Sequence, residues 1–281
     1  MTGGGGPGAR LAFVLGLAVL GLGLTAGAGA QALQRRADGA AYAGPAPVLV
    51  FAAVIALTLV VEFAVGALGV VPAGPPEVLA AVLASAGVSL GVVALVVVSP
   101  GALSWRAMGL RLPGPGAGSV VADVAWGIAF AVPTLFGAGL LAAAAVALLG
   151  VTPEPPVPPA GDPAGIAVNL LAAVVVAPLW EEAFFRGFVT TAWARAAGPQ
   201  AALWRGAVFF ALVHVLTLSG SDFGMALRAA VVAFVVRLPV GLVLGWVFLR
   251  RGTLVAPIAL HAAYNAIPLL LVALGAGAAA T

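Results

Sequence analysis

Cysteine and lysine are both absent from this chain of 281 residues, and charged residues of any kind are scarce. Without cysteine there can be no disulfide, no thiolate metal ligand and no cysteine nucleophile, so the redox compartment is not indicated. Without lysine, all 12 basic residues are scattered arginines, and no basic patch predicts nucleic-acid binding. Charged residues make up only 7% of the chain, too few to cover the surface of a water-soluble protein.

What is abundant is apolar sequence. Hydrophobic residues make up 63% of the chain and its mean hydropathy is +1.19, values typical of a protein that lives in lipid. Because a helix needs about 20 apolar residues to cross a bilayer, we expect an all-α fold, a polytopic transmembrane helical bundle of about eight spans. The expected spans are residues 11–30, 47–71, 78–98, 123–149, 166–192, 202–218, 225–249 and 253–274. The proline-rich run 153–163 predicts a stiff linker.

The arginines predict the orientation of these spans. Most of them fall in the odd-numbered loops: Arg35, Arg36, Arg106, Arg111, Arg195, Arg205, Arg250 and Arg251. Loops rich in arginine usually remain on the cytoplasmic side of a membrane. We therefore expect the odd-numbered loops in the cytoplasm and both termini on the outer side of the plasma membrane. The first stretch, with Arg10 and Ala28-Gly29-Ala30, also resembles a signal peptide, but Arg35-Arg36 favours a retained helix.

Three of the expected spans contain ionisable or amide side chains, which are costly in a membrane and are therefore functional candidates. The motifs are Trp180-Glu181-Glu182-Ala183-Phe184-Phe185-Arg186, Phe210-x-x-x-His214 and His261-x-x-x-Asn265, and they include both histidines of the chain. Two further charges, Glu62 and Arg237, lie in the middle of other spans. One hypothesis is that these two side chains neutralise each other.

Helical geometry assigns different roles to the two adjacent glutamates. Glu182 and Arg186 are four residues apart on one face, so a buried ion pair that supports the site is expected. Glu181 points about 100° away and stays free for chemistry. Counted from the arginines at their helix ends, Glu181, His214 and His261 lie at depths of roughly 13–21 Å, so that the three side chains can meet.

A glutamate beside histidines in a partly dry cavity is suited to activating water. Glu181 would act as general base, while an imidazole holds or relays the proton. The Asn265 amide would donate to a carbonyl oxygen that gains negative charge. The same residues can also be interpreted as a metal site, with Glu181, His214 and His261 as ligands of an ion such as zinc. The residues alone leave both interpretations open.

The three motifs, in this order on separate spans, resemble those of the CPBP intramembrane peptidases, also called the Abi or CAAX-protease family. This family includes the Ras-converting prenyl-protein endopeptidase. The resemblance rests on Glu181-Glu182-x-x-x-Arg186 and on the two histidine motifs, and it covers residues 120–275. We therefore expect residues 120–275 to form a catalytic helical core and residues 1–119 to form N-terminal transmembrane helices without an assigned role.

The resemblance implies hydrolysis of a peptide bond near the cytoplasmic side, with His214 beside the water-activating Glu181. His261 and Asn265 would stabilise the oxyanion, and Glu182 with Arg186 would support the site. The family is commonly described as metalloproteases, although a metal-independent mechanism is also held for it, so zinc is left open. The implied partner is a membrane-associated peptide or protein tail, prenylated in the eukaryotic relatives. The oligomeric state is not indicated.

Two other functions fit an intramembrane cluster of acid, arginine and histidine. A proton-coupled transporter uses such groups as a relay, but this sequence shows no repeat symmetry and no paired broken helices. A non-catalytic immunity or scaffold protein could keep the same fold and act by binding alone. Intact motifs are compatible with either turnover or binding.

Overall fold

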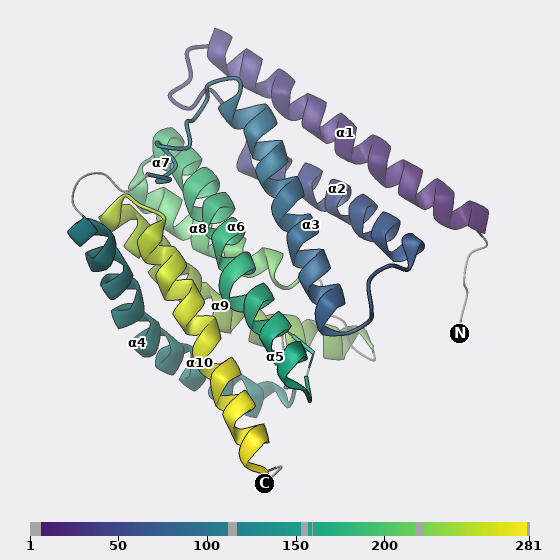
Figure 1. Ribbon diagram of the computed structural model, residues 1–281. Coiled ribbons are helices and arrows are strands. Elements are labelled where there is room, and N and C mark those ends of the chain that lie inside the picture. The colour runs from purple at the N-terminus through teal and green to yellow at the C-terminus, as the bar shows by residue number, and fades with distance from the viewer. Residues whose placement is uncertain (1–6, 112–116, 153–156, 159, 217–221, 280–281) are drawn as a thin grey trace. The chain divides into compact units, whose positions relative to one another are not determined.

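The computed structural model describes residues 7–111, 117–152, 157–158, 160–216 and 222–279 (Figure 1). Over these residues the chain is helical and contains no strand, which confirms the all-α prediction. Seven of the described helices are long and apolar enough to cross a membrane. The protein is therefore an integral, multi-pass membrane protein. The chain divides into two compact units, Met1–Ser104 and Trp105–Thr281, each described by itself below.

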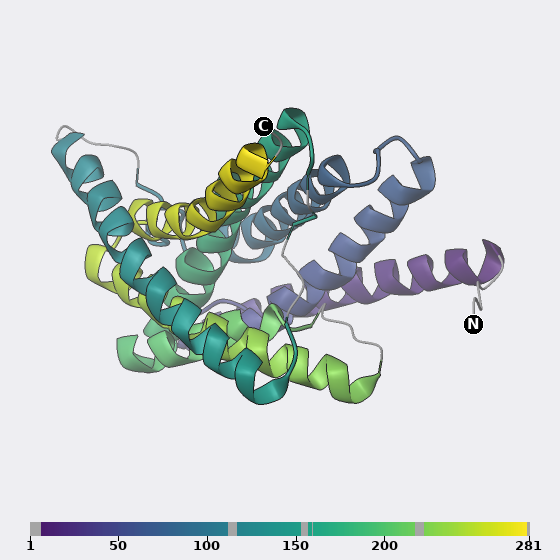
Figure 2. The same cartoon turned by 90° about the horizontal axis from the view of Figure 1, so that it is seen from below.

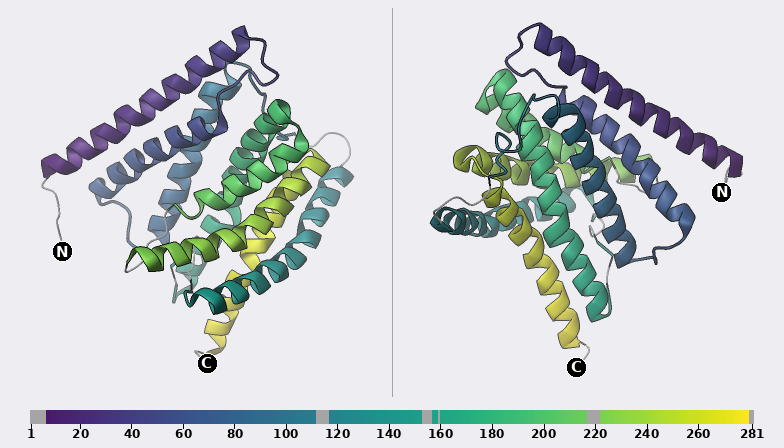
Figure 3. Two further views of the ribbon diagram at one scale, coloured as in Figure 1. Left: turned by 180° about the vertical axis from the view of Figure 1, so that it is seen from behind. Right: turned by 45° about the horizontal axis from the view of Figure 1, so that its top comes forward.

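The first unit consists of consecutive, neighbouring helices (Figure 3, right). Its helices are α1 (Pro7–Ala37), α2 (Pro47–Leu68), α3 (Pro75–Val93) and the short π-helical segment η1 (Ala94–Val98). Helices α1 and α2 approach closely at Gly21, where a Cβ atom would lie 2.7 Å from the side chain of Leu57. The Gln31 side chain fixes the connection between them by accepting a hydrogen bond of 2.6 Å from the Ala46 amide.

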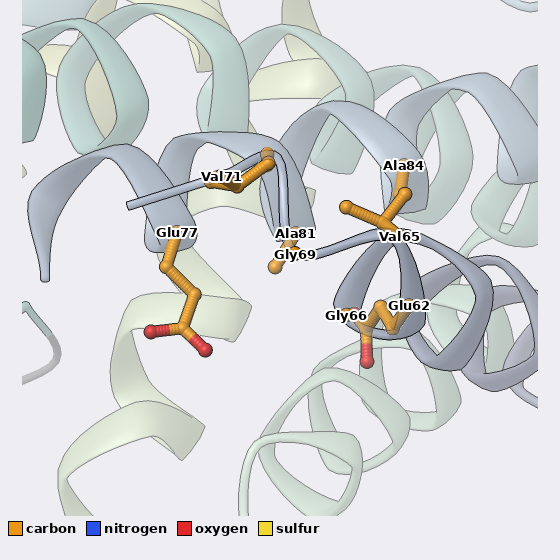
Figure 4. A pocket seen from close by; sticks show the side chains of 9 residues that line it. Glu62, Val65, Gly66, Gly69, Val71, Glu77, Ala81 and Ala84 are labelled. Carbon is orange, nitrogen blue, oxygen red and sulfur yellow. The ribbon is translucent and has the colours of Figure 1, made fainter. Parts of the chain in front are cut away.

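A small cavity of about 170 Å³ lies where α2 and α3 meet (Figure 4). Its lining is mostly small and apolar, with two carboxylates, Glu62 from α2 and Glu77 from α3. Glu77 is exposed and Glu62 half-buried. One of the two mid-span charges of the sequence thus borders this cavity of the first unit.

The second unit contains the sequence motifs. Its helices are α4 (Ala117–Leu149), α5 (Pro163–Leu170), α6 (Ala177–Glu182), α7 (Thr191–Ala197), α8 (Pro199–Val213), α9 (Phe223–Arg251) and α10 (Val255–Ala279), with π-helical segments η2 (Leu171–Val176) and η3 (Ala183–Thr190). From α5 to α7 the helix is continuous over residues 163–197. The Asp162 side chain caps its start by accepting a bond of 2.9 Å from the Gly165 amide.

Helix α4 packs against both α9 and α10 (Figure 2). The contact with α10 depends on Gly127, because a Cβ atom there would lie 2.5 Å from the carbonyl oxygen of Ala256. The contact with α9 is held at one end by an ion pair, in which Asp123 Oδ1 accepts from Arg251 Nε at 2.6 Å. On the other side of α9 lies α8 (Figure 3, left).

The span predicted over 202–218 is shorter in the structure. Helix α8 has 15 residues, which at about 1.5 Å per residue is less than the hydrocarbon thickness of about 30 Å. The helix stops at His214, where the amides of Val215 and Leu216 turn back to carbonyls three residues earlier. The predicted orientation of the loops and termini assumed that this segment crosses the membrane. That orientation stays a prediction.

The second unit begins at Trp105, whereas the predicted division of the chain lies at residue 119. The segment 105–111 packs onto the helices that carry the motifs: Met108 is buried, and its carbonyl oxygen lies 3.1 Å from the position of a Cβ atom on Gly187. The Gly109 carbonyl accepts a bond of 3.1 Å from the Leu254 amide. Of the predicted proline-rich linker, residues 153–156 and 159 lie outside the described residues.

Candidate active site

The two adjacent glutamates lie on α6, between two π-helical segments. π-helical turns are uncommon and occur often at functional sites. In η3 the hydroxyl of Thr190 donates to the carbonyl five residues earlier, at Phe185, over 2.9 Å. All residues of η3 after Ala183 are buried, so the helix that carries the acids is surrounded by protein at this level.

Glu182 is fully buried and binds two partners through one carboxylate oxygen. Its Oε1 accepts from Arg186 Nη1 at 3.0 Å and from His261 Nδ1 at 2.8 Å. The ion pair with Arg186 agrees with the sequence prediction. The bond to His261 was not predicted, because nothing in the spacing shows which of the two glutamates faces α10. Glu182 thereby ties α10 to the helix 163–197.

Glu181 faces the other histidine. Its Oε2 lies 3.6 Å from His214 Nε2, just beyond direct hydrogen-bond distance, and this buried oxygen has no hydrogen-bond partner among the residues that the structure describes. The structure thus brings together the acids and both histidines, as their matched depths predict, but in two separate pairs. A buried carboxylate oxygen without a partner requires a donor such as water.

His214 is positioned by the end of α8. Its Nδ1 lies 2.7 Å from the carbonyl oxygen of Phe210, one of the carbonyls that the end of a helix leaves unbonded. Since a carbonyl only accepts, Nδ1 must carry the proton, and in the neutral ring Nε2 presents its lone pair toward Glu181. The early end of α8 therefore fixes the tautomer of the histidine.

Phe210 is the packing centre of the site. Its ring lies 4.2 Å from the guanidinium carbon of Arg186, 4.3 Å from the ring centre of His214 and 6.1 Å from that of His261. The sequence motif includes this residue, but its contacts with all three were not predicted. A phenylalanine four residues before an intramembrane histidine is the only signal that could have indicated them.

Asn265 lies one turn beyond His261 on α10. Its Nδ2 donates a bond of 2.8 Å to the carbonyl of Ala173 in η2. One of its two amide hydrogens therefore holds α10 against the helix 163–197, and only the other could serve as the predicted oxyanion donor.

The residues predicted as zinc ligands do not converge in the structure. Glu181, His214 and His261 all lie in described segments, and among those segments no group of three His, Cys, Asp or Glu side chains could hold one ion. His261 Nδ1 is directed to Glu182 and His214 Nδ1 to Phe210. The donors as arranged in the described segments do not fit a three-residue metal site.

Comparison with known families supports the motif assignment. Residues 163–267, from the first residue of α5 into α10, match the family model described as type II CAAX prenyl endopeptidase Rce1-like. The matched segment contains every residue of the site from Glu181 to Asn265. Neither the curated proteins nor the solved structures gave a match.

Proposed function

Because residues 163–267 form a domain of the Rce1-like family of type II CAAX prenyl endopeptidases, we propose that this protein is an intramembrane endopeptidase that uses water activated by Glu181. One observation carries the proposal. Glu181 Oε2 is buried and has no hydrogen-bond partner in the described segments, and it lies 3.6 Å from His214 Nε2. A carboxylate oxygen and an imidazole lone pair both accept, so a water that donates one hydrogen to each satisfies both.

In the proposed reaction, the oxygen of this water attacks the carbonyl carbon of the peptide while Glu181 takes its proton. The carbonyl oxygen then carries the negative charge of a tetrahedral intermediate. When this intermediate collapses, the C–N bond breaks and the departing nitrogen receives the proton from Glu181. His214 keeps the water in line, because its own ring is held by the Phe210 carbonyl.

Glu182, Arg186 and His261 act in support. The bonds of Glu182 to the other two hold α6, η3 and α10 together at the level of Glu181. His261 can donate a hydrogen bond from Nε2 to the substrate only when its ring is doubly protonated, since Nδ1 already donates to Glu182. Asn265 can contribute its second amide hydrogen.

The proposed substrate is a membrane-associated peptide or protein tail that reaches the site from the cytoplasmic side. A prenylated tail is one form that the family description suggests. The depth of Glu181 supports a substrate that enters the bilayer, because the residue lies about 20 Å along its helix from Arg195. A fully soluble peptide would have to cross much of that distance.

The test compares membranes that contain the wild-type chain with membranes that contain Glu181→Gln at equal abundance. Mass spectrometry of newly formed peptide termini in the membrane proteome is the measurement. Peptide termini that occur only with the wild-type chain are the expected result, because the amide of glutamine cannot take the water's proton.

Glu77→Gln provides the matched control, since Glu77 is an exposed acid of the first unit, and it should leave the profile of termini unchanged. Identical profiles for wild type and Glu181→Gln, in cells that require the protein, would favour a binding or scaffold function. Ion or solute flux that depends on Glu181 in reconstituted vesicles would favour a transporter instead.

A further inference from the structure

Arg237 is, like Arg186, an arginine inside a membrane span of this unit. It lies in the middle of α9 and is half-buried. Its Nη1 donates a long hydrogen bond of 3.4 Å to the Ala233 carbonyl of its own helix. Within the described part of Trp105–Thr281, no carboxylate forms an ion pair with it. An arginine at this depth is costly in a membrane, so a neutralising partner is expected.

Arg237 lies on the face of α9 that meets the site, because Gly241, four residues further along the helix, accepts a bond of 3.4 Å from Arg186 Nη2. Tyr264 of α10 and Glu181 of α6 both contribute to the electrostatic environment of the Arg237 guanidinium. Residue counting places the three side chains at similar depths, because Glu181 lies 14 residues before Arg195, Arg237 lies 14 before Arg251 and Tyr264 lies 13 after it. At about 1.5 Å per residue, all three are roughly 20 Å from the helix ends that carry these arginines.

Resting on the hydrolysis proposed above, we infer that Arg237 is the counter-charge of the reaction, with the phenol of Tyr264 as a second donor. Arg237 offsets the negative charge of Glu181 before the reaction. After Glu181 has taken the proton of the water, Arg237 offsets the negative charge that has moved to the oxygen of the tetrahedral intermediate. The positive charge of Arg237 therefore has a negative counter-charge at every step of turnover.

The charges of the site support this role. Two carboxylates, Glu181 and Glu182, are balanced by two guanidiniums, Arg186 and Arg237. Water and a peptide bond are neutral, and proton transfer to Glu181 only moves one negative charge to the substrate oxygen, so the sum stays zero at every step. In a medium of low dielectric constant, such a balanced arrangement is favoured over one with a net charge.

An alternative role for Arg237 would be to bind a carboxylate on the substrate. That would add a third negative charge to a site that is already neutral, which the low dielectric constant disfavours. The oxyanion, by contrast, needs a donor. The amides and rings expected to provide one are partly engaged, His261 Nδ1 with Glu182 and Asn265 Nδ2 with Ala173. The guanidinium of Arg237 can therefore provide a further hydrogen-bond donor to the oxyanion.

The experiment uses the full chain in lipid nanodiscs and a synthetic peptide that spans a cleavage position found in the comparison of termini. We expect Arg237→Gln to lower kcat about 10²- to 10³-fold, the range for loss of a donor to an oxyanion, with little change in KM. Arg237→Lys should recover at least about tenfold, because the charge returns without the guanidinium geometry. Arg228→Gln, an exposed arginine near the start of the same helix, is the control and should match the wild type.

Each outcome distinguishes the inference from the proposed function. If the wild type cleaves no peptide, the proposed function is wrong. If Glu181→Gln is inactive and Arg237→Gln retains the wild-type kcat, only the inference about Arg237 is wrong. A rise in KM alone would make Arg237 a binder of substrate carboxylate, contrary to the inference.

A structural role is also tested. If both Arg237→Gln and Arg237→Lys fail to fold, or if exchanging the charges in Glu62→Arg/Arg237→Glu restores wild-type kcat, then Arg237 is a structural partner, as the sequence hypothesis of a Glu62–Arg237 pair states. Either result overturns the role in catalysis.

Discussion

His261 Nδ1 lies 2.8 Å from Glu182 Oε1, although the two residues are 79 positions apart in the chain. The same oxygen binds Arg186 Nη1 at 3.0 Å, so one buried carboxylate joins α6, η3 and α10. The second acid, Glu181, is left to face His214. The site therefore consists of Glu182, whose Oε1 binds both Arg186 and His261, and of Glu181, whose Oε2 lies 3.6 Å from His214 Nε2 without a direct hydrogen bond.

Replacing Glu182 by glutamine should destabilise the protein. Arg186 is 2% exposed, and loss of its partner leaves a buried charge, at a cost of about 3–5 kcal/mol. The double variant Glu182→Gln/Arg186→Gln should lose less than the sum of the two single variants, because neither charge is then left alone. Thermal unfolding in detergent measures this, with Glu77→Gln as the control. Equal stability of Glu182→Gln and the control would contradict the assigned role.

Two substitutions at His214 should separate its structural and chemical tasks. Asparagine can still donate to the Phe210 carbonyl and cap α8, whereas alanine cannot. We expect His214→Asn to unfold near the wild-type temperature and His214→Ala at a lower one. Both should lose about 10²- to 10⁴-fold in turnover, because the imidazole beside Glu181 is gone. Turnover of His214→Asn at the wild-type rate would exclude His214 from the reaction.

The packing of α4 on α10 should depend on the absence of a side chain at Gly127. Gly127→Ala would place a methyl group 2.5 Å from the Ala256 carbonyl oxygen, and relieving this overlap by moving backbone should cost about 1–3 kcal/mol. Gly137→Ala on the same helix is the matched control, since nothing lies within 4 Å of its added methyl group. Unfolding temperatures of the two variants in the same detergent measure the difference. If the two variants unfold together, the close approach of the helices is wrong.

Removal of metal ions should leave peptide cleavage unchanged. The predicted ligands Glu181, His214 and His261 do not converge on one point in the described structure. Activity before and after treatment with a strong chelator, together with elemental analysis of the purified protein, provides the measurement. Loss of activity that is restored by zinc alone would show that the three side chains rearrange around an ion.

Much of the architecture follows from local sequence. Apolar stretches of about 20 residues are expected to be helical in lipid, because a helix bonds its backbone polar groups within its own segment and exposes none to hydrocarbon. The spacing of Glu182 and Arg186 predicts their ion pair for the same local reason, since four residues bring them to one helix face. Helix α8 ends at His214, earlier than the span predicted from hydropathy, and the Phe210 carbonyl freed by this end bonds the His214 ring. A hydropathy profile does not contain such a helix end.

Composition and hydropathy are enough to predict the membrane location and the helical class, and the motifs are enough to propose which side chains form the site. These properties depend on composition and on periodicity within one helix. The pairing between helices emerges only from the folded chain, in which His261 bonds Glu182, His214 faces Glu181, and the Gly241 carbonyl of α9 accepts from Arg186. The physical reason is that partner choice between helices depends on their rotation and axial shift, which are set by packing at positions such as Gly127 and Phe210.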